Sequence, residues 1–165
     1  MKKNIKQKGF TLVELLLYMG IFTILLAVTL QMFSSIFDVQ LESQATSSVA
    51  QDSKYIMGRI THDLNRAQSI SVPSAYSTSS ATLTLVINGQ TYTYSLSGED
   101  LLLENITTGT TDRINSSETT VSDVSYLRLD GNGKDSIQMS FTLTSLTARR
   151  GGKEVETFQT TAGIR

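Results

Sequence analysis

Hydrophobic residues are concentrated in the first third of the chain. Between Phe10 and Leu30 the only charged residue is Glu14, and the few other polar residues are ones that a membrane helix tolerates. An apolar run of about 20 residues matches the roughly 30 Å hydrocarbon core of a bilayer. The pattern therefore predicts a transmembrane helix over residues 10–37, with a single carboxylate near its start.

The helical pattern continues beyond this run but becomes amphipathic. No proline precedes Pro73, and apolar side chains recur at helical spacing at Val49, Ile56, Ile60, Leu64 and Ala67. The intervening polar residues are expected mostly on the other faces of the helix: Gln51, Asp52, Arg59, Asp63 and Arg66. We therefore predict one long helix from about residue 10 to about residue 69, in which residues 38–70 form an amphipathic continuation that covers a sheet.

The period of the pattern changes to two in the second half of the chain. Residues 69–82, rich in serine and threonine around Pro73, predict a loop that ends the helix. Alternating segments predict further strands at residues 101–104, 121–129, 136–144 and 155–159, and residues 104–119 predict a long polar connection. The fold class is α+β, with residues 75–165 forming a β-rich domain whose antiparallel sheet packs on the second half of the helix.

The clearest hairpin surrounds Asn88 and Gly89. These two residues predict a type I′ turn between two alternating strands. That register places aliphatic residues opposite aromatic ones on one face, with Leu85 facing Tyr92 and Leu83 facing Tyr94.

The charge distribution predicts an orientation in the membrane. Four lysines and no acid occur in the first nine residues, whereas the rest of the chain has 10 basic and 15 acidic residues, a formal charge of −5. Basic residues beside a membrane helix favour the cytoplasmic side. We therefore expect a single-pass protein of the cytoplasmic membrane with a cytoplasmic N-terminus and an extracytoplasmic C-terminal domain. An acidic remainder argues against contact with nucleic acid.

The composition gives no support for catalysis or for a cofactor. The chain has no cysteine and one histidine, His62, which we expect to be a solvated surface residue of the helix. A thiolate metal site, a histidine-rich zinc centre and a Ser-His-Asp triad are therefore not indicated. We predict a protein that is not an enzyme, with no catalytic residues and no cofactor.

The segment KGFTLVELLLYMGIF, residues 8–22, resembles the prepilin signal of type IV pilins and type II secretion pseudopilins. The shared features are a basic leader, a Gly-Phe step, a glutamate four residues after the phenylalanine, and the apolar run. The resemblance implies that a prepilin peptidase removes residues 1–9 by cutting between Gly9 and Phe10, and that the new Phe10 amine is N-methylated. It also implies that residues 10–37 form the core of a filament.

The same resemblance implies a set of partners. They are the prepilin peptidase, other minor and major pilins, an inner-membrane assembly platform with its ATPase, and membrane lipid before assembly. Type IV pili, competence pili and type II secretion pseudopili share this N-terminal pattern, so the machine and the final location, cell surface or periplasm, stay open.

Glu14 has a physical role in this scheme. The cut creates a positive amine at Phe10, and residues four apart lie on one face of a helix. A lone carboxylate at membrane depth costs about 2.5 to 3.5 kcal/mol. A neighbouring subunit's Phe10 amine offsets that cost in only one axial register, so Glu14 is expected to set the register of filament assembly. Two alternatives remain open: the carboxylate reaches the lipid headgroups, or it pairs with the amine of its own chain.

The C-terminal half is similar to the globular domains of the J-type minor pseudopilins and the W-type minor pilins. The similarity lies in residues 94–104, 121–143 and 149–165. It implies a scarce subunit of a tip complex that initiates filament assembly. The apolar stretch LLAVTLQMF, residues 25–33, lacks the proline that many major pilins carry, which also favours a minor subunit.

Two further segments have alternative interpretations. Asp130, Asn132 and Asp135 could supply oxygens to a calcium loop, but Lys134 stands where an EF-hand needs an oxygen donor, and a glycine-rich hairpin turn is favoured. Arg149 and Arg150 are interpreted as a solvated turn.

Two rival functions fit parts of the same sequence. The chain could be a single-pass, membrane-anchored extracytoplasmic binding module, similar to an adhesin, in which the helix is only a tether. It could also be a secreted enzyme behind an ordinary signal peptide, in which case the mature chain would begin near Gln31.

Overall fold

The computed structural model describes residues 9–130 and 135–164. Its one helix in this part of the chain, α1, runs from Leu12 to Arg66, which confirms the single long helix predicted from the pattern. The structure divides into two compact units, residues 1–40 and 41–165, and each is described by itself.

The first unit consists of the apolar part of α1. Its large hydrophobic side chains, from Leu12 to Val39, are all exposed. The hydroxyls of Thr23 and Thr29 donate hydrogen bonds to the carbonyls of Met19 and Leu25, at 2.7 and 2.8 Å. These polar groups are therefore satisfied within the helix, as a membrane segment requires. Among the described residues, α1 is the one helix long and apolar enough to cross a membrane.

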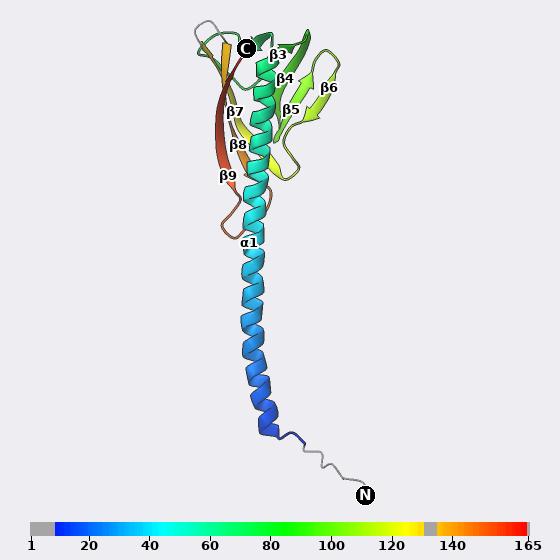
Figure 1. Cartoon of the computed structure of the whole chain (residues 1–165), viewed down its shortest axis with the longest axis vertical. Helices are drawn as coiled ribbons and strands as arrows, with labels where there is room; N and C mark the ends of the chain where they lie inside the picture. Colours follow the sequence, from blue (N-terminus) through cyan, green and yellow to red (C-terminus); the bar gives the residue numbers. More distant parts are fainter. Residues whose placement is uncertain (1–8, 131–134, 165) are drawn as a thin grey trace. The chain divides into compact units, whose positions relative to one another are not determined.

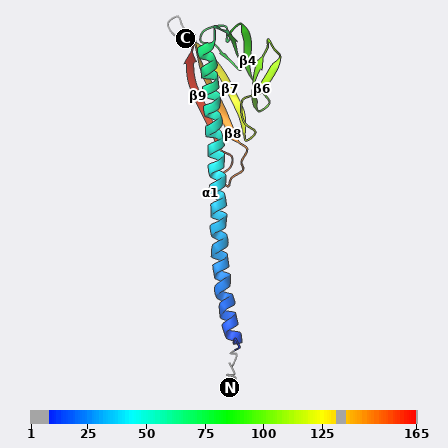
Figure 2. The same cartoon turned by 45° about the vertical axis from the view of Figure 1, so that its right-hand side comes forward.

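The second unit contains two antiparallel sheets, where the sequence predicted a single sheet (Figure 1, Figure 2). The five-stranded sheet has the order β1-β3-β4-β5-β6, and the four-stranded sheet has the order β2-β7-β8-β9. The strands are β1 (Ser69–Val72), β2 (Ser79–Ser80), β3 (Leu83–Ile87), β4 (Gln90–Ser97), β5 (Asp100–Asn105), β6 (Thr110–Arg113), β7 (Thr119–Asp130), β8 (Asp135–Ser145) and β9 (Val155–Gly163).

One hydrophobic core joins the second half of α1 to both sheets. The five residues predicted to face the sheet are all buried: Val49, Ile56, Ile60 and Leu64 of α1, and Ala67, which directly follows the helix. They belong to the same cluster as alternating residues of the strands, such as Leu83 and Leu85 of β3 and Met139 and Phe141 of β8. The apolar residues that recur every 3.6 positions in the helix and every second position in the strands thus belong to one core.

The predicted hairpin is confirmed. Asn88 and Gly89 both have positive φ, 53° and 75°, as a type I′ turn requires. Leu85 pairs with Tyr92 and Leu83 pairs with Tyr94 across β3 and β4.

Two segments predicted as loops contain strands. β1 and β2 lie within residues 69–82, and β1 pairs with β3 along a register that shifts between Ile70 and Val72. β6 lies within the predicted polar connection and pairs with β5. The part of that connection after β6 is held in place, because the side chain of the buried Asn115 accepts a hydrogen bond from the Leu101 N–H and donates one to the Thr119 carbonyl.

The solvated turn predicted at Arg149 and Arg150 is wrong for Arg149. Its guanidinium forms ion pairs with Glu42 of α1 and with Glu154, and its side chain is only 18% exposed. Arg149 and Glu42 lie 107 residues apart in the sequence. A local sequence pattern could therefore not reveal this ion pair.

Candidate functional site: the N-terminal motif and its helix cap

Thr11 marks the start of α1. Its backbone carbonyl accepts the first helical hydrogen bond from the Leu15 N–H at 3.1 Å, and its hydroxyl oxygen accepts one from the Glu14 N–H at 3.3 Å. This is the geometry of a helix N-cap, in which a side-chain oxygen satisfies one of the free N–H groups of the first turn. Gly9 and Phe10 therefore precede the helix and have no helical conformation.

Glu14 occupies the third position of the helix. Thr11 and Glu14 together have the spacing of a capping box, in which a threonine is followed three residues later by a glutamate. A carboxylate in the first turn is also stabilised by the positive end of the helix dipole. The helix end thus lowers the free-energy cost of this charge. The Thr-x-x-Glu spacing is visible in the sequence, but its capping role was missed.

Phe10 and Glu14 lie at the same surface hollow. Gly9, Phe10, Thr11 and Glu14 line an open hollow of about 380 Å³. The Phe10 side chain is 75% exposed, and its ring contacts that of Tyr18 edge to face, with 6.1 Å between centroids. The structure therefore brings together the three site residues predicted from the sequence, Gly9, Phe10 and Glu14, and adds Thr11 to them.

The structure describes two of the three residues of the possible calcium loop, Asp130 and Asp135. Asn132 lies outside the described residues, while Asp130 and Asp135 pair at the ends of β7 and β8, which fits the hairpin interpretation. The Asp135 carboxylate accepts two hydrogen bonds from the Arg128 guanidinium, at 3.2 and 2.8 Å. The hydrogen bond from Arg128 is the main cause that lowers the pKa of Asp135. The calcium loop stays an untested alternative to the favoured hairpin turn.

His62 is exposed, as predicted. Its side chain is 60% exposed, and its Nδ1 lies 3.1 Å from an oxygen of Asp63. Within residues 9–130 and 135–164, no three His, Cys, Asp or Glu side chains gather in a way that could hold a metal ion.

Two carboxylates of α1 that were expected mostly on other faces are in fact buried. Asp52 accepts hydrogen bonds from Ser116 and Thr119. Asp63, which is 4% exposed, accepts a hydrogen bond of 2.6 Å from the Tyr94 hydroxyl and one of 3.1 Å from the Arg59 Nε. Burial and then the bond to Asp63 raise the pKa of Tyr94 well above its ordinary value, so its hydroxyl remains a donor.

Comparison with protein families identifies the N-terminal segment. The prokaryotic N-terminal methylation motif matches residues 4–30, a range that includes the Gly9-Phe10 step, Thr11, Glu14 and most of the apolar run. Comparisons with curated proteins and with solved structures gave no significant match. Proteins that carry such a motif are structural rather than catalytic. The motif, together with one long N-terminal helix packed against antiparallel sheets, supports membership of this chain in a type IV pilin-like family.

Proposed function

We propose that this protein is a minor pilin or pseudopilin, a structural subunit at the tip or at the initiation point of a type IV pilus, competence pilus or type II secretion pseudopilus. The observation that carries the proposal is the coincidence of the methylation motif, over residues 4–30, with a helix that begins two residues after the Gly9-Phe10 bond. The chain would then have a leader at residues 1–9, a filament-core helix at 10–37, an amphipathic helix at 38–70 and a globular domain at 75–165.

The cap geometry supports cleavage between Gly9 and Phe10. A protease binds its substrate as an extended backbone, and glycine lets that backbone approach closely. Because Thr11 caps the helix, the bond between Gly9 and Phe10 lies outside the helical hydrogen-bond ladder. The prepilin peptidase would cut this bond at the cytoplasmic face of the membrane, and the new Phe10 amine would be methylated.

The position of Glu14 supports a role in register. The new amine would form at Phe10, which lines the same hollow as Glu14. Inside a filament, the Glu14 carboxylate of one subunit would pair with the Phe10 amine of a neighbour, which compensates a charge that costs about 2.5 to 3.5 kcal/mol when left alone. The pairing would be available in one axial register only.

The exposed apolar helix supports exchange between membrane and filament. The large hydrophobic side chains of residues 12–39 are exposed in the part of the chain that the structure describes. Lipid tails and neighbouring apolar helices are similar surroundings, so transfer between them is close to neutral in free energy. An assembly platform with its ATPase would lift the subunit out of the bilayer, and the domain would reach the pilus or pseudopilus.

The substitution Glu14→Gln tests this function. The variant should remain in the membrane but be absent from sheared filaments, because the register pair is lost, and a Glu104→Gln control on an exposed face of β5 should assemble normally. Normal entry of Glu14→Gln into filaments would contradict the proposal. Display of the domain at the surface without any filament association of the native chain would instead support the tethered, adhesin-like binding module.

A further inference from the structure

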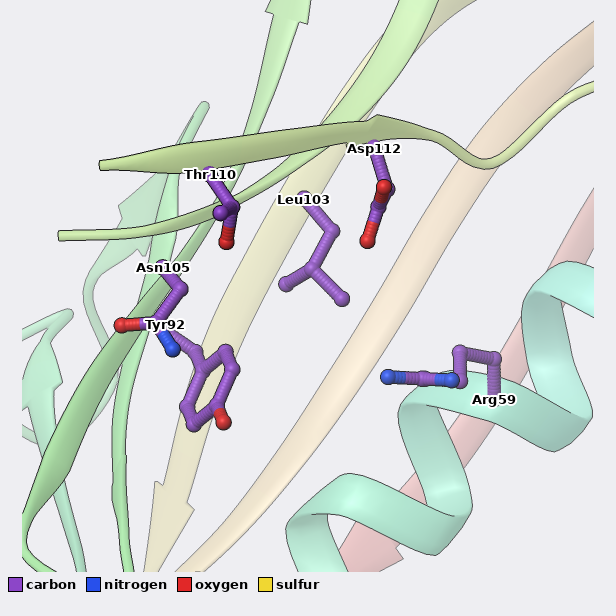
Figure 3. Close-up of a pocket in the computed structure, with 6 residues that line it drawn as sticks. All are labelled: Arg59, Tyr92, Leu103, Asn105, Thr110 and Asp112. Carbon is purple, nitrogen blue, oxygen red and sulfur yellow. The ribbon is translucent and has the colours of Figure 1, made fainter. Parts of the chain in front are cut away.

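A polar pocket lies between α1 and the strands β4, β5 and β6 of the five-stranded sheet, within the second unit (Figure 3). It has a volume of about 210 Å³, and its lining residues are Arg59, Tyr92, Leu103, Asn105, Thr110 and Asp112. Leu103 belongs to the hydrophobic core and Tyr92 packs against it, but neither the core nor the methylation motif accounts for the polar and charged residues beside them.

The register of the sheet brings the five strand residues together. Tyr92 pairs with Asn105, and Asn105 pairs with Thr110, so one row of side chains crosses β4, β5 and β6. The next row on the same face includes Leu103 and its partner Asp112. Directly opposed residues of antiparallel strands share a face. The two rows therefore form one wall of the pocket.

Arg59 faces this wall from the helix and is held in position. Its Nε donates a hydrogen bond of 3.1 Å to Asp63, and the buried Asp63 carboxylate is itself fixed by the Tyr94 hydroxyl at 2.6 Å. Figure 3 shows the Arg59 guanidinium extending from α1 toward the strand residues. With Nε engaged, the two terminal nitrogens remain as further donors of a residue that lines the pocket.

Asp112 supplies the opposite charge. Its side chain projects from β6 on the other side of the pocket (Figure 3), and no residue in the described part of the chain forms an ion pair with it. Tyr92 and Asn105, in contrast, both donate hydrogen bonds to Gln90 and are thereby fixed. The pocket thus presents a positioned cation and an anion that do not pair with each other.

We propose that this pocket binds a free α-amino acid. A guanidinium fork matches the two oxygens of a carboxylate, and Asp112 would accept hydrogen bonds from the ammonium group. The Tyr92 ring and the Leu103 side chain would contact a small apolar side chain. A zwitterion meets both the Asp112 carboxylate and the terminal nitrogens of Arg59, which is already paired with Asp63 through Nε. A simple anion leaves Asp112 without a partner, and a simple cation makes no use of the Arg59 nitrogens. The small volume limits the ligand to a few heavy atoms.

The test is a titration of the full-length, isotope-labelled chain in detergent micelles, followed by NMR. L-alanine is the probe, and acetate, methylammonium and glucose are the comparison ligands. Alanine should shift the backbone amides of Thr110 and Asp112 in a saturable manner and bind at least tenfold more tightly than any comparison ligand. Absence of saturable shifts, or tighter binding of glucose, would overturn the proposal.

Substitutions in the pocket test whether alanine binds there. Asp112→Asn should weaken alanine binding at least tenfold, while Glu104→Gln, on the adjacent position of β5 that is exposed on the other face, should leave it unchanged. Arg59→Lys keeps a charge beside Asp63 but removes the fork, and should also weaken binding. Unaltered spectra away from the pocket establish that each variant is folded. Equal binding by Asp112→Asn and the native chain would contradict the assignment.

Discussion

The Asp52 carboxylate of α1 accepts hydrogen bonds from both the backbone N–H and the hydroxyl of Ser116, at 2.9 and 2.8 Å. Thr119, at the start of β7, donates a further bond to the same oxygen. Ser116 lies in the connection between β6 and β7, where the chain leaves one sheet and enters the other. A single buried carboxylate of the helix therefore binds the segment of chain that connects the two sheets.

Removal of this carboxylate should destabilise the second unit. Asp52→Ala leaves the buried Thr119 hydroxyl and the two donors of Ser116 without their acceptor, and we expect the free energy of unfolding to fall by about 1 to 3 kcal/mol. Urea denaturation of the full chain in micelles, followed by tyrosine fluorescence, measures the loss. Lys54→Ala, at an exposed position of the same helix, is the control and should change stability by no more than about 0.5 kcal/mol. Equal stability of the two variants would show that the junction does not depend on Asp52.

Two glycines should respond to alanine in opposite directions. Gly89 has a φ of 75° in the hairpin turn, so Gly89→Ala should destabilise by about 1 to 2 kcal/mol. Gly58 lies on an exposed position of α1 with nothing within 4 Å of an added Cβ, so Gly58→Ala should stabilise by about 0.5 to 1 kcal/mol. Thermal denaturation measures both shifts, and shifts of the same sign would contradict the backbone geometry.

The pairing of Asp135 with Arg128 should make the free energy of unfolding fall when the solution becomes acidic. The pKa of Asp135 is lowered in the folded state, chiefly by the hydrogen bonds from Arg128. This stabilisation is complete above the ordinary value of 3.8 and is lost as the pH falls through the lower, folded-state pKa. NMR titration should therefore give an Asp135 pKa below 3.8 in the native chain and a higher one in Arg128→Gln. An unchanged pKa in Arg128→Gln would refute the assigned cause, and Arg66→Gln is the control.

The elements with strong periodicity were predictable from the sequence. The apolar stripe of α1 and the Asn88-Gly89 hairpin follow from local pattern, because each repeats a signal over several residues. The strand β6 was missed because all four of its residues are exposed and none is apolar. The division into two sheets was also missed. The bulge in β7, between Ser122 and Ser125, shifts the alternation of buried residues by one and gives no sequence signal.

Part of the candidate site was predictable because its residues form a local sequence pattern. Gly9, Phe10 and Glu14 belong to a contiguous motif, and the Thr11 cap could have been recognised from its spacing to Glu14. The buried carboxylates Asp52 and Asp63 could not, because their partners Ser116 and Tyr94 follow 64 and 31 residues later. Only the folded chain shows that these carboxylates are buried and accept hydrogen bonds from distant residues.

The Thr11 cap should affect processing. Thr11→Val removes the hydroxyl at nearly constant shape and should cost about 1 kcal/mol of helix-end stability, so that the first turn, which carries Glu14, frays. A frayed turn no longer presents Glu14 at a fixed spacing from the cleavage step, so we expect processing of this variant by prepilin peptidase to be about fivefold slower, in line with that cost. Thr11→Ser keeps the hydroxyl and should be processed normally. Gel assays of leader removal over time measure the rates, and equal rates for Thr11→Val and the native chain would exclude a role for the cap.

The most direct test of the proposed function is mass spectrometry of the mature N-terminus of the native chain. The account predicts a chain that begins at Phe10, with the leader of residues 1–9 removed and a methyl group on the new amine. A mature chain that begins near Gln31, or one that retains its leader in the presence of an active prepilin peptidase, would contradict it.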